Sequence, residues 1–171
     1  ERVGRAGAVV HVGYNRRFYG SVRKALAMIK ASGEEIANVV FEFTEWADVI
    51  GALTNQSAAV KRRWLLANSM HVIDLALFPV GLPDPARSHF YTSGELDWHK
   101  PAAFAGAGMT TRGVLFSCSA NWDAPGRWGA EWMTPSTRYI FRPLEKLHVT
   151  KRGSVAITEV ELDDDLDQRF K

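Results

Sequence analysis

The fold is decided by residues 8–44, which read AVVHVGYNRRFYGSVRKALAMIKASGEEIANVVFEFT. Residues 8–14 are dominated by valine, whose branched side chain packs well on a pleated surface, so we predict a strand there. Residues 39–44 alternate with a period of two, which is typical of a strand with one face on the core. A helix between them completes a strand–helix–strand unit at the start of the chain.

This helix is predicted from its start signal, its apolar spacing and its stop signal. Ser21 carries a hydroxyl that can cap a helix, and Val22, Leu26 and Ile29 follow at spacings of four and three. Gly33 stands where a helix needs a left-handed residue to end. The pattern therefore predicts a helix from Ser21 to the residue before Gly33.

The rest of the chain changes from helical to strand-like patterns. Residues 64–78 are rich in Leu, Ala and Ile, and predict a second helix that ends before a proline-rich loop over 82–87. Short alternating runs typical of strands follow at 114–122, 128–134, 137–142, 147–150 and 155–162. Arg152-Gly153-Ser154 is typical of a hairpin turn, and residues 163–167 of an acidic tail. We predict an α+β fold in which two helices pack on one face of a largely antiparallel open sheet.

Length and composition limit the class of protein. The chain has 171 residues, 46% hydrophobic and 23% charged, which is enough for one domain over 1–171 and too little for two full ones. The formal net charge of +2 is too small to attract a polyanion by field strength, so we expect neither nucleic acid nor a membrane as partner. Six Trp, nine Phe and four Tyr exceed what a sheet covered on one side can hide, so another domain or subunit should cover the rest.

Cysteine content and the ends of the chain bear on location. Cys118 is the only cysteine, which excludes an intramolecular disulfide and fits a reducing compartment. No stretch approaches the ~18 consecutive apolar residues that span a bilayer, and the start lacks the apolar core of a secretion signal. We expect a cytoplasmic protein. The charged opening at Glu1, which is not an initiator methionine, predicts that the sequence is a fragment.

One predicted helix face brings an imidazole beside a carboxylate. His71, Asp74 and Phe78 are spaced three and four apart. Such a pair fixes an imidazole tautomer for proton transfer, so His71 is a candidate catalytic residue and Asp74 its support. The same pair also occurs as a plain buried hydrogen bond, and a lone helical histidine is more often structural than catalytic.

Two arginines follow the first predicted strand. Adjacent strand residues point to opposite faces, so at most one of Arg16 and Arg17 can serve a given pocket. The arginine fork suits carboxylate, phosphate or polyol oxygens. The alternative is a salt bridge to Glu42 or Glu45 on the next predicted strand.

Residues 121–128, NWDAPGRW, join two predicted strands through a proline–glycine turn. Aromatic faces and charged hydrogen-bonding groups are typical of sugar sites, so Trp122 and Arg127 are candidate substrate contacts. The alternative is a tight turn whose tryptophans fill a core or an interface. Asp123 and Glu131 could form a glycosidase pair, which needs two carboxyl groups roughly 5 to 10 Å apart in one cleft.

Motifs for nucleotides and metals are absent from the sequence. Gly106-Ala107-Gly108 has Thr111 where the third glycine of a dinucleotide fingerprint belongs, and no Gly-Lys-Ser/Thr phosphate loop occurs. The five histidines form no close metal-ligand pair. We expect neither a nucleotide cradle nor a metal site in this chain.

The most specific motifs are residues 12–19 (VGYNRRFY), 41–46 (FEFTEW), 68–75 (NSMHVIDL) and 120–128 (ANWDAPGRW), with 143–145 (PLE) after them. In this order, and over nearly the whole chain, they resemble the C-terminal domain of the glucose-fructose oxidoreductase and inositol dehydrogenase (Gfo/Idh/MocA) family. That family joins an N-terminal Rossmann domain for NAD or NADP to a C-terminal domain with a large open sheet. The resemblance implies that the C-terminal domain contacts substrate and forms the oligomer interface, and that this chain lacks the Rossmann domain.

The resemblance also implies reversible hydride transfer between a nicotinamide and a hydroxyl carbon of a sugar, polyol or sugar derivative. Such a reaction needs a proton acceptor beside the hydroxyl. His71 matches the histidine of the family's Asp-x-x-x-His pair, whereas Ala67 stands at its acid, and the lysine that shares this work lies in the absent half. Asn15 and Arg16 match the region near the bound substrate, and Asn68 could hold a substrate hydroxyl.

We therefore expect the substrate-binding and assembly domain of an NAD(P)-dependent oxidoreductase that acts on a sugar-like small molecule. The isolated chain is expected to be catalytically incomplete, to hold no cofactor by itself, and to form a homo-oligomer through its sheet face. The alternative is a non-enzymatic binding or scaffold domain of the same fold, which Ala67 favours.

Overall fold

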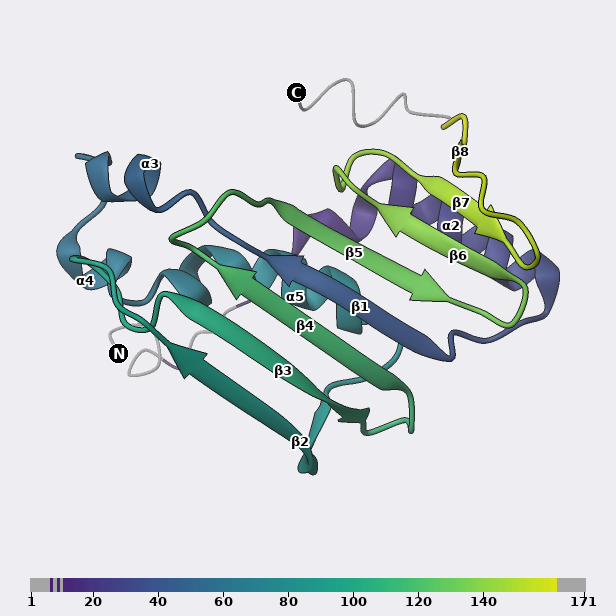
Figure 1. Ribbon diagram of the computed structural model, residues 1–171, viewed down its shortest axis with the longest axis horizontal. Helices are drawn as coiled ribbons and strands as arrows, with labels where there is room; N and C mark the ends of the chain where they lie inside the picture. The colour runs from purple at the N-terminus through teal and green to yellow at the C-terminus, as the bar shows by residue number, and fades with distance from the viewer. Residues whose placement is uncertain (1–6, 8, 10, 163–171) are drawn as a thin grey trace.

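The computed structural model describes residues 7, 9 and 11–162. Their centre is one eight-stranded sheet in the order β2-β3-β4-β1-β5-β6-β7-β8 (Figure 1). The strands are β1 (Asn38–Phe43), β2 (Pro83–Ser93), β3 (Ala103–Thr110), β4 (Leu115–Asn121), β5 (Trp128–Met133), β6 (Thr137–Phe141), β7 (His148–Lys151) and β8 (Thr158–Glu159). Strands β1 and β4 pair in parallel, and every other neighbouring pair of this sheet is antiparallel. The predicted acidic tail lies outside the described residues.

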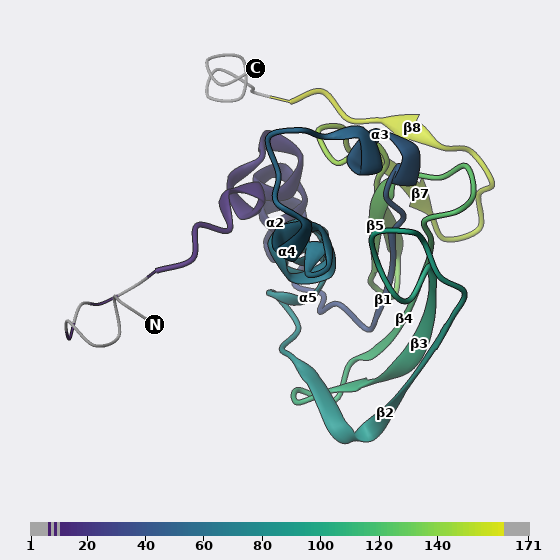
Figure 2. The same cartoon turned by 90° about the vertical axis from the view of Figure 1, so that its left-hand side faces the viewer.

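The helices cover one face of the sheet and one of its ends (Figures 1 and 2). They are the 3-10 turn η1 (Asn15–Phe18), α2 (Gly20–Ser32), α3 (Ala47–Ala52), α4 (Ala58–Lys61), the π-helical turn η2 (Leu65–Ser69) and α5 (Met70–Leu77). Helices α2 and α5 lie behind the sheet in Figure 1, and α3 and α4 lie at its end. The predicted α+β class, with helices on one face of a largely antiparallel sheet, is confirmed.

The predicted strand over 8–14 is wrong. Residues 9 and 11–14 form no strand, and residues 8 and 10 lie outside the described part of the chain. Val9 and Val12 are 81% and 68% exposed, because this segment has no neighbouring strand against which to pair. Val9 and Val12 are thus without the sheet that strand formation requires.

The helix predicted over 21–32 is confirmed as α2, but its start differs. Gly33 ends the helix in the left-handed conformation, with φ of 68°. Ser21 does not cap it: Tyr19 is the N-cap residue and makes no side-chain cap, while the Ser21 hydroxyl donates to the Leu144 carbonyl at 2.5 Å. The second predicted helix is confirmed as η2 followed by α5, and the 64–78 region ends as predicted.

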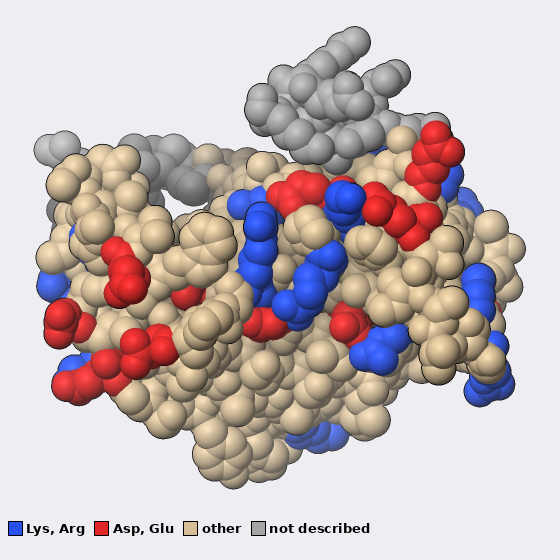
Figure 3. Space-filling model, turned by 45° about the horizontal axis from the view of Figure 1, so that its top comes forward, with Lys and Arg blue, Asp and Glu red and all other residues tan. Residues whose placement is uncertain are grey.

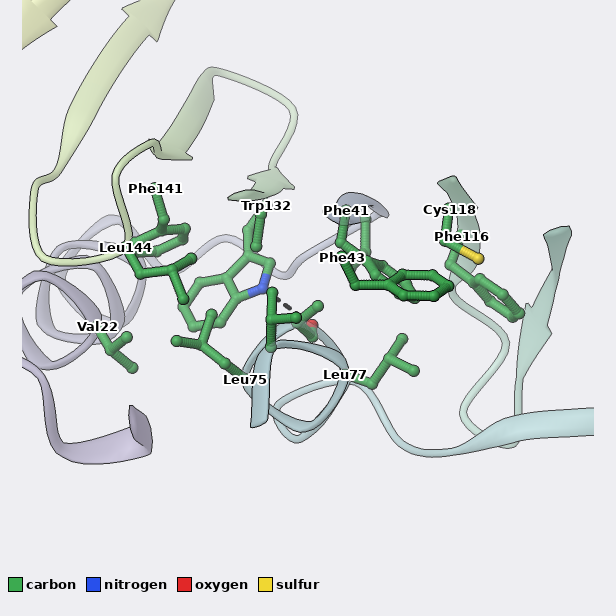
Figure 4. Close-up of a cluster of buried hydrophobic side chains, with 14 of the residues drawn as sticks. Val22, Phe41, Phe43, Leu75, Leu77, Phe116, Cys118, Trp132, Phe141 and Leu144 are labelled. Carbon is green, nitrogen blue, oxygen red and sulfur yellow. Dashed lines mark hydrogen bonds between the residues drawn. The ribbon is translucent and has the colours of Figure 1, made fainter. Parts of the chain in front are cut away.

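The core lies between the sheet and the helices α2 and α5 (Figure 4). Alternate residues of β1 face it, so Phe41 and Phe43 are buried as the two-residue period predicts. Trp132 on β5 is fully buried, and its indole nitrogen donates to the Ala76 carbonyl of α5 at 3.0 Å. This hydrogen bond satisfies the one polar atom of the indole, so the large apolar ring is buried without a polar penalty.

Strands β2 and β3 were not predicted, and the loop expected over 82–87 is largely the start of β2. Prolines open β2, which is tolerated because it is an edge strand, and its register shifts between Pro83 and Ser88. Strand β3 contains Gly106 and Gly108, which weaken the local strand signal. A Cβ atom on Gly108 would lie 2.6 Å from the backbone of β2, so the close approach of these strands requires glycine.

The predicted hairpin at Arg152-Gly153-Ser154 is confirmed. Gly153 has φ of 79°, and β7 and β8 pair in antiparallel fashion on either side of the turn. The strand predicted over 155–162 is limited to Thr158–Glu159, because β8 lies at the edge of the sheet and pairs with only part of the short β7.

The other face of the sheet, here named the open face, carries no helix of the described chain (Figure 2). Ala107, Ser117, Val40, Glu131 and Ile140 follow one another across its centre in register. Charged side chains of both signs are interspersed on the surface seen in Figure 3. The ion pairs on this face include Arg138 with Glu131 and Arg142 with Glu42.

Candidate functional site

A cleft of about 350 Å³ lies beside the residues that follow β1, and we name it the β1 cleft. Segments far apart in the sequence meet there: η1, the end of β1, α3, η2, and the segments around β5 and β6. Its polar and aromatic lining consists of Arg16, Thr44, Glu45, Trp46, Trp64, Asn68, Arg127, Trp128 and Glu145, and its aliphatic lining of Val49, Ile50, Leu53 and Leu144. Aromatic walls with a few convergent polar groups are typical of a small-molecule site.

Glu45 is the most deeply buried charged residue of the cleft, with 7% exposure. The Ser69 hydroxyl donates to one of its carboxyl oxygens at 2.6 Å, and the Asn68 amide donates to both oxygens at 3.2 Å. Burial raises the pKa of Glu45 above its ordinary value, because desolvation outweighs these hydrogen bonds and those of nearby indoles. A buried carboxyl with a raised pKa in a cleft is a candidate functional group.

Glu45 was not among the predicted site residues, although the sequence contains a signal for it. Val39, Phe41, Phe43 and Glu45 fall on one side of the period-two pattern, so a carboxylate continues the buried face of β1. A charged residue on an otherwise apolar strand face is costly to bury unless it is hydrogen-bonded, so it indicates a polar site inside the protein.

Of the two predicted arginines, Arg16 lines the β1 cleft and Arg17 does not. The guanidinium of Arg16 lies over the Trp128 ring, 4.8 Å from its centroid, and donates to the Tyr19 hydroxyl. Its Nε atom is buried and has no hydrogen-bond partner among the described residues. The alternative, a salt bridge from one of these arginines to Glu42 or Glu45, is not seen among the described residues. Arg17 pairs with Asp74 instead, and Glu42 pairs with Arg142.

His71 lies on α5, one helical turn beyond the cleft-lining Asn68. Its ring is partly buried and meets the Tyr14 ring edge-on, with centroids 5.8 Å apart, and its Nδ1 atom has no hydrogen-bond partner among the described residues. Burial lowers the pKa of His71, and the charge of Arg16 lowers it further, against the raising effect of Asp74. The positive charge of Arg16, which lines the β1 cleft, therefore acts on the His71 imidazole.

Asp74 is held by Arg17 and not by His71. The Arg17 Nε atom donates to one carboxylate oxygen of Asp74 at 2.6 Å, and a second guanidinium nitrogen donates to the other. Asp74 therefore acts on His71 through its charge, and its predicted support role does not involve a hydrogen bond to the ring.

The remaining predicted substrate contacts lie apart from one another. Arg127 lines the β1 cleft with an exposed side chain, while Asn15 is exposed on η1 and does not line the cleft. Trp122 is 1% exposed, donates to the Phe43 carbonyl at 3.1 Å, and packs against His99 with centroids 4.5 Å apart. Both of its faces are covered by protein, so the position of Trp122 agrees with the structural interpretation and not with contact to a substrate.

The two carboxylates considered for a glycosidase do not share a cleft. Glu131 pairs with Arg138 on the open face, and Asp123 lines a different hollow beside Trp46 and Pro125. The requirement for two carboxyl groups in one cleft is therefore not met by this pair.

Other reactive groups of the described residues are few. Burial raises the pKa of the Cys118 thiol to about 11, which disfavours the reactive thiolate. No group of three or more His, Cys, Asp or Glu residues suited to a metal ion occurs in the described part of the chain. Within residues 7, 9 and 11–162, no helix is long and apolar enough to cross a membrane.

Comparison with known proteins gives likenesses of structure. No family model matches the sequence, and no curated protein matches it. A levoglucosan dehydrogenase solved with NADH and levoglucosan has a TM-score of 0.67 at 16% identity, over 91% of this chain and 48% of that chain. UDP-N-acetylglucosamine 3-dehydrogenase from Acidithiobacillus ferrooxidans has 0.59 at 14% identity, over 95% and 49%. An oxidoreductase from Pseudomonas syringae has 0.65 at 12% identity, over 93% and 43%.

These likenesses establish a shared fold. The chain spans about half the length of each of these solved structures. The fold of this chain is therefore that of one part of larger oxidoreductases, among them sugar dehydrogenases.

Proposed function

We propose that this chain is the substrate-binding and assembly domain of a nicotinamide-dependent oxidoreductase that acts on a sugar, polyol or sugar derivative. The observation that carries the proposal is the β1 cleft beside the His71 helix, in a fold shared with part of two sugar dehydrogenases. The chain is catalytically incomplete alone in this proposal, and a Rossmann domain supplies the rest.

The cleft lining supports a polyhydroxylated ligand. Arg16 and Arg127 offer hydrogen-bond donors from two walls, and the side-chain oxygen of Asn68, whose amide nitrogen donates to Glu45, offers an acceptor from a third. The Trp46 ring is 56% exposed and is held by its own hydrogen bond to the Gly126 carbonyl at 2.9 Å. An exposed, fixed indole face is suited to the apolar face of a sugar ring.

His71 is the proposed proton acceptor for the substrate hydroxyl. Its lowered pKa favours the neutral imidazole near neutral pH, and a neutral imidazole can accept a proton. Its Nδ1 atom is buried and has no hydrogen-bond partner among the described residues, so the proposal assigns proton transfer to Nε2. When bound, a nicotinamide supplies the hydride acceptor.

The coenzyme itself is assigned to another domain. A phosphate cradle needs glycines in a loop before a helix, whereas Gly106 and Gly108 lie inside β3 against β2. The described residues thus fit contact with the substrate and do not fit the coenzyme's phosphates. In the same proposal, the open face of the sheet forms the homo-oligomer contact.

A non-enzymatic binding domain is the second candidate, because Ala67 on η2 has no ionisable group. One assay separates the two. In this assay the chain is joined to the nucleotide-binding domain that the proposal assigns to the whole protein, and reduction of NAD+ and NADP+ is followed with a panel of sugars and polyols. Substrate-dependent reduction supports the oxidoreductase, whereas binding of a sugar without reduction of either coenzyme supports the binding domain.

A further inference from the structure

Two arginines line the β1 cleft without an acidic partner of their own. Arg16 lies on η1, and Arg127 is the residue before β5. Among the salt bridges of the described residues, none involves Arg16 or Arg127, although Glu45 and Glu145 line the same cleft. Neither arginine charge is therefore neutralised by the part of the chain that the structure describes.

Arg127 has an exposed side chain on a fixed backbone. Its backbone N–H donates to the Glu42 carboxyl at 3.3 Å, and the carbonyl of the preceding Gly126 accepts a hydrogen bond from the Trp46 indole at 2.9 Å. The guanidinium itself makes no hydrogen bond to a described residue. Because the side chain is exposed, its N–H donors are open to a ligand.

Arg16 is half-buried and is held in place by aromatic rings. Its guanidinium lies over the Trp128 ring, 4.8 Å from the centroid, and one terminal nitrogen donates to the Tyr19 hydroxyl. The Nε atom is buried, but the other terminal nitrogen is neither buried nor hydrogen-bonded to a described residue. This terminal nitrogen is therefore accessible, on a residue that lines the cleft. The stacked guanidinium is already ordered, so it loses little freedom when it binds.

The two arginines meet at Trp128. Arg16 stacks on the ring of this residue, and Arg127 directly precedes it in the chain. Positive charges on the wall of a cleft attract a negative group, and the arginine fork is suited to anions that carry several oxygens. A neutral hydroxyl has one oxygen and no charge, so it would leave this pair of charges uncompensated.

The acidic residues of the cleft do not compensate the arginines. The Glu45 carboxyl is bound by other donors, among them the Ser69 hydroxyl at 2.6 Å and the Trp128 indole. Burial also raises the pKa of Glu45, which favours its neutral form. Glu145 is half-buried after β6 and forms no salt bridge with a described residue. An anion in the cleft would face the charge of Glu145, so removal of that charge should strengthen binding.

We propose that Arg16 and Arg127 bind an anionic group of the ligand, a carboxylate or a phosphate, so that the substrate is an acidic sugar derivative and not a neutral sugar. The proposal rests on the sugar-binding function proposed above and deepens it by naming the charge of the substrate. Both anions offer several oxygens to the two arginine forks. An ammonium group at the same place would be repelled by both arginines.

The test uses the 171-residue chain labelled with nitrogen-15. Its probes are glucose, galactose and mannose, each as the neutral sugar, as the uronate and as the phosphate ester of the primary hydroxyl. The indole N–H resonance of the exposed Trp46, assigned by Trp46→Phe, reports binding in the cleft. At low ionic strength, an acidic form is expected to bind about tenfold or more tightly than its neutral sugar, because charge-assisted hydrogen bonds are the stronger ones.

Matched variants assign this preference to the two arginines. Arg127→Gln and Arg16→Gln should each weaken binding of the acidic form about tenfold more than binding of the neutral sugar. Glu145→Gln should strengthen binding of the acidic form. Arg152→Gln removes an exposed arginine at the β7–β8 turn, with the same change in net charge, and should bind like the unmodified chain. The buried Trp132 resonance reports that each variant is folded, and Arg127→Gln decides alone if Arg16→Gln does not fold.

The outcomes separate this proposal from the function on which it rests. Preference for the uronate identifies a carboxylate as the anionic group, and preference for the phosphate ester identifies a phosphate. Acidic forms that bind no more tightly than their neutral sugars, or a preference that Arg127→Gln and Arg152→Gln retain equally, overturn the anion site and leave sugar binding in place. No shift of the Trp46 resonance with any of these sugars overturns the proposed function as well.

Discussion

Arg17 and Asp74, which are 57 residues apart in the sequence, form a two-pronged ion pair that joins η1 to α5. The pair determines which arginine serves the β1 cleft, because Arg17 is committed to Asp74 while Arg16 reaches Trp128. The pair also leaves His71 without a hydrogen bond from the acid on its own helix, because Arg17 donates to both carboxylate oxygens of Asp74.

Arg17→Ala should lower the free energy of unfolding by about 1 to 3 kcal/mol, because it leaves the 11% exposed Asp74 carboxylate without its partner. Urea denaturation measures the change. Lys100→Ala is the matched control, since Lys100 and Glu95 are 72% and 65% exposed and their pair should contribute at most about 1 kcal/mol. Equal effects of the two substitutions would show that the pair does not join η1 to α5 energetically.

Gly108→Ala should destabilise the fold by about 1 to 3 kcal/mol, because the added Cβ meets the backbone of Arg87 and Ser88 at 2.6 Å. Gly13→Ala should change stability by less than about 1 kcal/mol, since nothing lies within 4 Å of the added atom and φ is not positive there. Thermal unfolding of both variants compares them. If Gly108→Ala left the thermal stability unchanged, β2 and β3 would separate more easily than their pairing indicates.

Stability should fall as the pH drops below the ordinary histidine pKa of 6.5, partly because of His71. Its folded pKa is lowered, so the unfolded chain binds the proton more readily, and the folded state loses stability as pH falls through this window. His71→Gln should remove part of this loss. Urea midpoints at a series of pH values measure it, and an unchanged difference between the proteins across the window contradicts the prediction.

The open face should form the contact between copies of the chain. Light scattering at high concentration is expected to give a mass above that of a monomer, and Ser117→Arg, which puts a long charged side chain at the centre of this face, should return it to a monomer. Arg63→Glu, on the helical side of the chain, should leave the mass unchanged. A monomer at every concentration would remove the open face as an interface.

Elements with a strong local period could be predicted from the sequence. Val22, Leu26 and Ile29 with Gly33 gave α2, and the alternation of Phe41 and Phe43 gave β1. Strands β2 and β3 could not be predicted, because Pro83 and Gly108 are residue types that are typical of loops. Pro83 is tolerated at the edge of the sheet, and Gly108 is required by the close approach of β2 and β3, and both facts are visible only in the folded structure. Neighbouring strands override local propensity in such segments.

The candidate site was predicted less completely than the fold. Arg16, Asn68 and Arg127 meet in the β1 cleft, and His71 lies beside it. Trp122 follows the same type of aromatic pattern but is buried, because sequence pattern does not distinguish an indole that binds a ligand from one that fills a core. Glu45 was missed because its partners on η2 are brought to it only by the tertiary fold.

The turnover number of the His71→Ala variant, in the chain joined to the nucleotide-binding domain that we propose for the whole protein, tests the central claim most directly. The account predicts that kcat for sugar-dependent reduction of NAD+ or NADP+ falls roughly 100- to 10,000-fold, because proton transfer from the hydroxyl loses its acceptor. His148→Ala, a histidine on β7 that pairs with Glu159, should leave kcat unchanged. An unchanged kcat in His71→Ala would contradict the account.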